Sequence, residues 1–456
     1  MAEHQTMSPA DAAWLHMDSP TNLMVINAVL WFDEPLDWDA ARATFMERIV
    51  ERFPRFRQRV REGLPGRPPS WHGDSSFEPG LHFHRLALPA PAGQAVLQEV
   101  VSDLITTPLD RSRPLWDVYL LEGYGSGCAV LIRMHHAIAD GIALSRVMLS
   151  MTDSGGHPVG FSDEASPDRG RGTPAIAFDL ARTLAREGFE TIRRPARLGS
   201  LARTTTDDAR TLAKLLLPGS DTPSPLRGEL AVGHRVAWSA PVSLATVKRT
   251  GKLMGATVND VLVAAVAGAV GDHLRDRGEP VDELHALVPF NLRPLDEPLP
   301  RELGNHFGLL VLGLPVGIED PLDRLAAVCE NMAAIKRSHE GPIAYSILGL
   351  IGRTPLVVER RLVGFFSAKG TMVLTNVPGP REEVTFAGTP VRGVLVWAPC
   401  SGSVGMSVSV FSYAGKVTVG FLADSALVED PQELADGFRR HVQQLARSAR
   451  STAVPA

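Results

Sequence analysis

Cysteine is scarce in this sequence, and its scarcity excludes two ways of stabilising a fold. Three cysteines occur among 456 residues, at Cys128, Cys329 and Cys400. Their number is odd and their spacing fits no zinc ligand set, so we expect neither a disulfide framework nor a zinc site. Each lies in or beside an apolar run, which is typical of buried thiols in a reducing compartment. We therefore expect a cytoplasmic protein.

An excess of one charge and a long hydrophobic run are also missing. The formal net charge is -5 and the sequence pI is near 6.3, which provides no basic footprint for nucleic acid, so no nucleic-acid partner is expected. The longest apolar run, Val261–Val270, is shorter than the roughly 20 residues that span a bilayer. The first residues lack the basic and apolar regions of a signal peptide. Any membrane contact is expected to be peripheral.

Motifs that bind phosphates or activate a nucleophile do not occur either. The sequence contains no Gly-x-Gly-x-x-Gly and no phosphate loop, which argues against a Rossmann dehydrogenase and a nucleotide hydrolase. Ser401–Gly405 (Ser-Gly-Ser-Val-Gly) comes closest to a nucleophile elbow. A strand follows it where the elbow needs a helix, so we interpret it as a turn.

Strands alternate with helices in both halves of the chain, which predicts a mixed α/β (α+β) fold. The chain exceeds the roughly 250–300 residues at which a single core stops growing, so more than one domain is expected. Loop-like stretches rich in Gly, Pro and Ser flank an Ala- and Arg-rich helical stretch between the halves. We expect an N-terminal domain over residues 1–154, a connector over 155–232 and a C-terminal domain over 233–456.

The residues best suited to chemistry lie on one predicted strand-to-helix turn. Residues 127–134 are apolar and begin at a glycine, which predicts a buried strand. Asp140 stands where a helix N-cap belongs, and Gly141 follows it. His135 and His136 therefore lie between two rigid elements, where catalytic groups concentrate. Imidazole is also the side chain best matched to proton transfer near neutral pH.

Residue chemistry alone leaves three interpretations of this turn open. In the first, one imidazole is the general base of an acyl transfer and Asp140 orients the loop or the ring. In the second, His135, His136 and Asp140 are metal ligands, although no further cluster supplies the remaining ligand that zinc usually needs. In the third, the histidines are satisfied core residues and Asp140 is only a helix cap.

A basic segment, Pro54–Val60 (Pro-Arg-Phe-Arg-Gln-Arg-Val), precedes this turn. It alternates basic with less polar residues, which is typical of an edge strand with one solvated face.

The chain resembles the bacterial wax ester synthase/diacylglycerol acyltransferase family, part of a larger group of CoA-dependent acyltransferases with a His-His-x-x-x-Asp-Gly motif. The motifs run in order along nearly the whole chain. They are Met7–Asp11 (Met-Ser-Pro-x-Asp), Pro54–Arg59, Pro114–Trp116, His135–Gly141, Val258–Val261, Val288–Arg293, Leu303–Asn305 and Thr375–Pro380. One such motif would be weak evidence, but the ordered set is specific.

This resemblance implies an O-acyltransferase in which His136 removes the proton from the acceptor hydroxyl. The substrates would be acyl-CoA and either diacylglycerol, giving triacylglycerol, or a long-chain alcohol, giving a wax ester. His135 would orient its neighbour or help to place the substrate. No cofactor is expected, because acyl-CoA is itself a substrate. The alternatives are a condensation-type enzyme with a carrier-bound donor and a non-catalytic lipid-binding protein.

The resemblance also implies roles for residues around the histidines. Asp140 would hold the motif loop by pairing with an arginine, for which Arg293 is the candidate. Gly141 would let the backbone approach the substrate closely. Asn259 would stabilise the oxyanion or fix the substrate, with a helix cap as the alternative. Asn376 would line the substrate channel.

The implied fold is two chloramphenicol-acetyltransferase-like domains joined by a helical crossover, with the active site at their interface. Because both substrates are apolar, attachment to a membrane or lipid-droplet surface is a further hypothesis. Residues 343–351 and 362–366 are the candidate stretches, and their alternative interpretation is core or channel wall.

Overall fold

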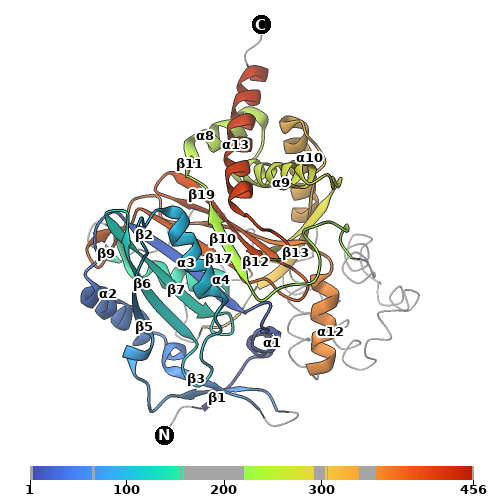
Figure 1. The fold of residues 1–456 in the computed structure, drawn as a ribbon. Helices are drawn as coiled ribbons and strands as arrows, with labels where there is room; N and C mark the ends of the chain where they lie inside the picture. The colour runs from blue at the N-terminus through green and yellow to red at the C-terminus, as the bar shows by residue number, and fades with distance from the viewer. Residues whose placement is uncertain are drawn as a thin grey trace.

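The computed structural model describes residues 4–63, 67–154, 157–158, 220–291, 303–305, 307–337 and 356–453. Helices and strands alternate in both halves, so the predicted mixed α/β class is confirmed. Two larger sheets organise the described chain (Figure 1). Of the expected connector, residues 159–219 lie outside the described residues.

The first sheet has five strands in the order β17-β2-β7-β6-β5. Their bounds are β17 (Gly393–Trp397), β2 (Val25–Phe32), β7 (Gly127–His135), β6 (Trp116–Tyr124) and β5 (Phe83–Ala87). All residues of β7 are buried, as its apolar composition predicts. It forms the predicted strand and pairs with β6 across a tight turn in which Gly125 adopts a φ of 57°.

Helices and small sheets surround the first sheet. The helices are α1 (Pro9–Met17), α2 (Trp38–Phe45), α3 (Gln94–Thr106), α4 (Gly141–Leu149) and α12 (Leu356–Ser367), with short helical turns at Met46–Val50, Pro54–Arg57 and Pro79–Leu81. One small sheet has the order β1-β4-β3, with β1 (His4–Thr6), β4 (Ser70–Gly73) and β3 (Gln58–Arg61). The other has the order β16-β15-β8-β9, with β16 (Thr389–Pro390), β15 (Thr385–Phe386), β8 (Thr152–Ser154) and β9 (His157–Pro158).

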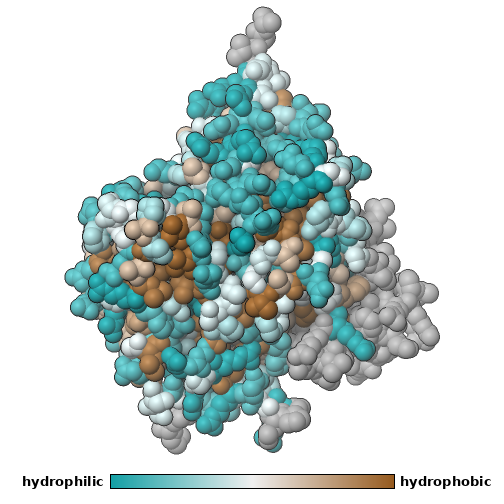
Figure 2. Space-filling view, viewed as in Figure 1, coloured by the Kyte–Doolittle hydropathy of each residue, from teal (hydrophilic) through white to brown (hydrophobic). Residues whose placement is uncertain are grey.

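The second sheet lies in the C-terminal half, with the order β10-β19-β18-β14-β12-β13. Its strands are β10 (His234–Trp238), β19 (Lys416–Asp424), β18 (Met406–Tyr413), β14 (Met372–Pro378), β12 (Leu284–Asn291) and β13 (Phe307–Leu314), with β11 (Val242–Ser243) beside β19. The helices α8 (Leu244–Met254), α9 (Val258–Asp276), α10 (Pro321–Arg337) and α13 (Gln432–Ala453) gather beside it at the top of Figure 1. On the face shown in Figure 2, hydrophilic residues cover these helices, and hydrophobic residues gather lower, toward the sheets.

The prediction of a strand starting at Pro54 is wrong for its first four residues. Pro54–Arg57 forms a 3-10 turn, and the strand begins only at Gln58. Proline suits the first position of a helix because its φ is preset and its missing N–H would have no partner there. The N–H of Phe56 donates to the carbonyl of Phe53 and closes the turn.

Within the described residues, no single helix is both long and apolar enough to cross a membrane. Only α8 and α9 together have the length and composition, and they are bent by 100° to each other. Most residues of α9, including Val261–Gly271, are buried. Its apolar composition is thus explained by packing in the core.

Candidate active site

The predicted strand-to-helix turn forms at the end of β7. Asp140 is the N-cap of α4, and its Oδ1 accepts the N–H of Ala143 at 2.8 Å, so the predicted cap is confirmed. His135 ends β7, and its N–H donates to the carbonyl of Leu115 at 3.0 Å. The turn is therefore fixed by the strand on one side and by a capped helix on the other.

His135 is held by its own loop and by a partly buried carboxylate. Its Nδ1 accepts the N–H of Ala137 at 3.0 Å, so in the neutral ring the proton lies on Nε2. That Nε2 lies 3.7 Å from Oδ2 of Asp18, whose Oδ1 accepts the N–H of Met24. Burial raises the pKa of Asp18, but interactions with His135 and other donors outweigh it and lower the pKa to about 2. His135 has the geometry of an orienting residue, since its basic nitrogen is already engaged.

His136 has a different environment. Its ring stacks on the indole of Trp14 from α1, with centroids 4.0 Å apart, and only 4% of the residue is exposed. Its N–H donates to the carbonyl of Met24 at 2.7 Å. Burial lowers the pKa of His136 to about 3, against smaller raising effects from its own backbone and from Asn305. The ring is therefore a neutral imidazole at physiological pH, which is the form that a general base requires.

Two residues to which no role was given from the sequence hold the backbone of His136. Asn305 Nδ2 donates to the His136 carbonyl at 2.9 Å and to Asp11 Oδ1 at 2.8 Å. The N–H of Asn305 donates to the same Asp11 oxygen at 3.1 Å. Both side chains are buried, and the contact joins α1, the histidine turn and the C-terminal half. It thus places His136 at the junction of the two halves.

The sequence contained a signal for this contact. Asp11 is the last residue of the motif Met7–Asp11, and Asn305 is the last residue of the motif Leu303–Asn305. Both motifs belong to the set by which the chain resembles the acyltransferase family. Nothing in their spacing relates two residues 294 positions apart.

Asn259 and Asn376 lie against each other. Asn376 Nδ2 donates to Asn259 Oδ1 at 2.8 Å, so the amide nitrogen of Asn259 remains available as a donor. It faces Met332 Sδ at 3.9 Å, a weak acceptor. The cap of α9 is Thr257, in a capping box with Asp260, so the alternative that Asn259 caps the helix is wrong. His136 is fixed by Met24, Trp14 and Asn305 and not by this pair of asparagines.

Gly141 is not required by crowding within the protein. A Cβ placed on it would meet only Ile26 Cδ1, at 3.9 Å, which is an ordinary van der Waals distance. Packing against a neighbouring protein segment therefore does not require a glycine at this position. The remaining expectation is that Gly141 allows a bound molecule to approach the backbone. Arg293, the candidate partner of Asp140, lies outside the described residues.

The site has the groups for a direct, base-assisted transfer. Burial raises the pKa of both Cys128 and Cys400, so neither thiol is a ready nucleophile near neutral pH. Within the described ranges, no three or more His, Cys, Asp or Glu side chains are grouped so as to hold a metal ion. The backbone of His136 is fixed from both halves, by Met24 in the N-terminal half and by Asn305 in the C-terminal half.

Comparison with known proteins gives matches over both halves. Residues 7–262 match the wax ester synthase/diacylglycerol acyltransferase catalytic domain, and residues 303–446 match the C-terminal domain of the same family. A relative from Mycobacterium tuberculosis, named "Probable diacylglycerol O-acyltransferase tgs1", is 30% identical over 422 residues, which cover 88% of this chain and 87% of the relative.

Solved structures share the fold. The wax ester synthase/diacylglycerol acyltransferase from Marinobacter aquaeolei VT8 aligns with a TM-score of 0.69 at 21% identity, covering 98% of this chain and all of that one (100%). The first condensation domain of the calcium-dependent antibiotic synthetase aligns with a TM-score of 0.59 at 17% identity, covering 99% and 97% of the two chains. At these identities the likeness concerns the fold alone, and it confirms the expected two-domain architecture.

Proposed function

Since this chain belongs to the wax ester synthase/diacylglycerol acyltransferase family, it is an O-acyltransferase of diacylglycerol or long-chain alcohols, and we propose that its donor is a long-chain acyl-CoA. The observation that carries the assignment of the base is the environment of His136. It is buried and neutral, stacks on Trp14, and is fixed through its carbonyl by Asn305. No cofactor enters the proposed reaction.

The proposed reaction proceeds without an acyl-enzyme. His136 takes the proton of the acceptor hydroxyl as the oxygen attacks the thioester carbonyl, and a tetrahedral oxyanion forms. The carbon–sulfur bond then breaks, the ester forms, and the imidazolium returns its proton to the CoA thiolate. Base assistance of this kind contributes typically about 10²–10⁴-fold to the rate. The raised pKa values of Cys128 and Cys400 support a route that does not use a cysteine nucleophile.

Asn259 is proposed to donate to the oxyanion through its Nδ2, and Asn376 to keep that amide in the required orientation. The 2.8 Å bond from Asn376 to Asn259 Oδ1 supports this division of roles. Asp140 is proposed to hold the turn, and Gly141 to border the substrate. Oxyanion donors of this kind are worth about 3 kcal/mol in other enzymes.

The test is CoA release from palmitoyl-CoA with diacylglycerol or hexadecanol as the acceptor. We expect acceptor-dependent release by the wild type and a loss of about 10²–10⁴-fold in His136→Ala. His84→Ala is the matched control, because it removes a more exposed imidazole outside the turn. Equal rates in wild type and His136→Ala would remove His136 from the mechanism. Absence of release with both acceptors, but product formation from a carrier-bound acyl group, would favour the condensation-type alternative.

Peripheral attachment to a membrane or lipid-droplet surface, by an otherwise cytoplasmic protein, is proposed from the apolar character of the substrates. One candidate stretch, 343–351, lies outside the described residues. In the other, Leu362 is buried in the core, and Val363 and Phe366 pack against it. Phe365 is half-buried beneath Lys369 Nζ, which lies 4.9 Å from its ring. Of the second stretch, we therefore assign the surface role to Phe365.

Flotation with phosphatidylcholine–phosphatidylglycerol liposomes tests this attachment. The wild type is expected to float with the liposomes, and Phe365→Ser to float less. Unchanged flotation of the variant would exclude residues 362–366 as the anchor, and absence of flotation by the wild type would contradict peripheral attachment itself.

A further inference from the structure

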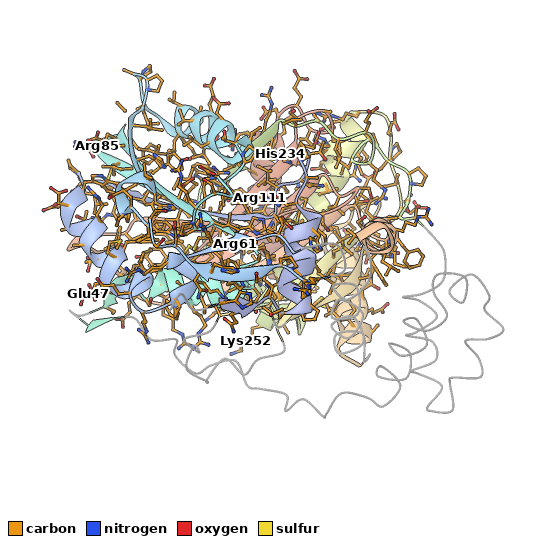
Figure 3. All side chains as sticks on the ribbon, turned by 90° about the horizontal axis from the view of Figure 1, so that it is seen from below. Glu47, Arg61, Arg85, Arg111, His234 and Lys252 are labelled. Atoms are coloured by element: carbon orange, nitrogen blue, oxygen red, sulfur yellow. The ribbon has the colours of Figure 1, made fainter. Side chains whose placement is uncertain are left out.

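The outer face of the small sheet β1-β4-β3 carries a row of basic side chains directly opposite one another. Arg59 of β3 pairs with His72 of β4, and His72 pairs with His4 of β1. Two residues further along each strand, Arg61, Ser70 and Thr6 form the next row on the same face. We call these six residues the basic face. Figure 3, viewed from below, looks toward this sheet and labels Arg61 near the middle of the molecule.

The basic side chains on this face lie close enough to disfavour one another's charged forms. Side chains opposite each other on antiparallel strands have Cβ atoms about 4.5–5.5 Å apart, and like charges there destabilise the sheet. The His4 and His72 ring centroids are 4.6 Å apart. Burial lowers the pKa of His72, and the charges of His4, Arg61 and Arg59 lower it further.

Counter-charges are lacking on the basic face. Among the described residues, neither Arg59 nor Arg61 has an ion pair. Glu62 follows β3 directly, but it accepts from Arg111 Nη1 at 3.1 Å and does not pair with Arg59 or Arg61. The whole chain has a net charge of -5, so this concentration of cations is local. The arrangement has the composition of an anion site, with two guanidinium groups flanked by imidazoles and hydroxyls.

The inner face of the same sheet leads toward the histidine turn. Trp71, which is fully buried, lies under the Arg55 guanidinium, with 4.7 Å from that group to the ring centroid. The charge of Arg55 in turn acts on Asp11, which holds Asn305 and through it the His136 carbonyl. The basic face is thus the solvent side of a thin layer whose other side supports the proposed base.

We propose that the basic face binds the phosphate groups of the acyl-CoA donor, with Arg59 and Arg61 as the principal contacts. This inference rests on the proposed function, in which acyl-CoA is the donor. The 3′-phosphate and the diphosphate of CoA are the anionic part of that substrate, and they remain in solvent while the thioester enters the protein. Guanidinium groups match phosphate oxygens in geometry, and a bound anion would offset the charges of the two neighbouring arginines on β3.

The test compares two donors that share the palmitoyl-pantetheine part and differ in the phosphorylated nucleotide. We expect Arg59→Gln/Arg61→Gln to raise the KM for palmitoyl-CoA about tenfold or more, because both charged contacts to the phosphates are removed; tenfold corresponds to about 1.4 kcal/mol. Its kcat is expected to stay close to that of the wild type. With palmitoyl-pantetheine, which lacks the nucleotide and its phosphates, the KM of the variant should equal that of the wild type.

A charge-matched control is provided by Lys248→Gln/Arg249→Gln. Both residues are exposed on α8, at the opposite end of the molecule from the small sheet (Figure 1). This variant should leave both KM values unchanged. The wild-type KM for palmitoyl-CoA should also rise with ionic strength, and that of Arg59→Gln/Arg61→Gln should rise less. Because neither arginine has an ion pair among the described residues, Arg59→Gln/Arg61→Gln is expected to preserve the thermal midpoint of the free protein.

Two results would overturn the inference. The first is an unchanged KM for palmitoyl-CoA in the double variant, and the second is an equal rise for both donors. If the unchanged KM is accompanied by a loss of binding to phosphatidylglycerol vesicles, the basic face would be assigned to a lipid headgroup.

Direct binding separates this inference from the proposed function. Calorimetric titration of CoA into the wild type and the double variant measures the basic face without turnover. If the wild type transfers no acyl group from palmitoyl-CoA, the proposed donor is wrong. If it does, but both proteins bind CoA equally, only the basic face is wrong.

Discussion

The burial of His136 decides the pH range over which it can act as a base. Its pKa is lowered to about 3, first of all by desolvation, so the neutral ring persists well below the usual histidine range. A base acts in its neutral form, and acid inactivates it only as the pH falls through that lowered value. We therefore expect kcat/KM to be retained as the pH falls from 7 to 5. A decline with an apparent pKa near 6.5, in protein that circular dichroism shows to be folded, would contradict this.

Asn305 contacts the backbone of His136, so its proposed role is that of a positioning residue. Its Nδ2 donates to the His136 carbonyl, and Asp11 fixes the amide. We expect Asn305→Ala to lower kcat about tenfold to a hundredfold, because misplacement of a catalytic group by about 1 Å costs that much, and to leave KM for the donor nearly unchanged. Steady-state kinetics with both substrates varied would separate the two constants.

A matched control for this variant is Asn331→Ala. Asn331 Nδ2 also donates to a backbone carbonyl, that of Gly313, at 2.9 Å, but on α10 in the C-terminal half. It should lower stability without lowering kcat. Equal losses of kcat in the two variants would show that Asn305 is only structural.

The variant Gly141→Ala distinguishes a glycine needed for protein stability from a glycine needed for substrate binding. A Cβ there has room, and alanine is the better helix former by up to about 1 kcal/mol, so Gly141→Ala should be as stable as the wild type or slightly more so. We expect its kcat/KM to fall, because the methyl group would meet the substrate. Gly268→Ala is the contrast: its Cβ would lie 2.6 Å from His441 Nδ1, so it should lower the thermal midpoint. Full activity of Gly141→Ala would contradict a substrate beside Gly141.

Local residue roles could be predicted from the sequence where the chemistry is local. The cap at Asp140 follows from side-chain type and position, and it forms. The contact of Asp11 with Asn305 could not be derived in this way, because its partners are brought together by the tertiary fold. The assignment of His136 over His135 as the base came from resemblance, and the different hydrogen bonding of the two rings supplies a physical reason for it.

At the scale of elements, α3 covers an edge of the second sheet with side chains. Edge strands present unpaired backbone groups, and β10 stands at one end of the sheet order. Gln94 Nε2 donates to the Trp238 carbonyl at 2.8 Å, and Ser102 Oγ accepts the N–H of Val236 at 3.0 Å. The next contact runs from the N–H of His234 to Thr106 Oγ1 at 3.3 Å. From Ser102 to Thr106 the helix advances four residues while the strand advances two, and both steps are about 6–7 Å, so these two contacts stay in register.

Ser102 is the central contact of this series. Its replacement by alanine leaves the N–H of Val236 buried without that acceptor, which costs about 1–3 kcal/mol. We expect Ser102→Ala to lower the free energy of unfolding by that amount in urea denaturation followed by circular dichroism. Ser451→Ala is the control, because Ser451 also donates to the carbonyl four residues earlier in its helix but is exposed. Equal stability of the two variants would contradict the covering role of α3.

Elements with a strong local pattern were predictable, whereas their pairing was not. The strand β7 follows from its apolar run and from the glycine at its start. Nothing local indicates that β17, from the C-terminal half, pairs with β2 of the N-terminal half. The stretch at Pro54 was mistaken for strand because alternation was weighed above the preference of proline for a helix start.

At the scale of the whole molecule, the two halves share a sheet and a site. β17 pairs with β2 along its whole length, from Gly393 opposite Trp31 to Trp397 opposite Asn27. A second link between the halves is formed by Asn22, whose Nδ2 donates to the carbonyls of Gly402 and Val404 at 3.0 and 3.2 Å. Trp397 and Leu395 are fully buried in the core of the N-terminal half. The halves are therefore expected to depend on each other for stability.

Division of the chain tests this dependence. A fragment of residues 1–232 lacks β17, so the apolar strand β2 becomes an unprotected edge, and His136 loses Asn305. We expect this fragment to aggregate when it is expressed alone. Co-expression with residues 233–456 should restore a soluble complex with CoA-releasing activity, because the missing strand and Asn305 are then supplied in trans. A fragment of residues 1–232 that is monomeric and unfolds cooperatively would show that the N-terminal half does not need β17. Adding residues 233–456, which supply Asn305 and the proposed oxyanion donor Asn259, would in that case restore the rate without changing the stability of the first fragment.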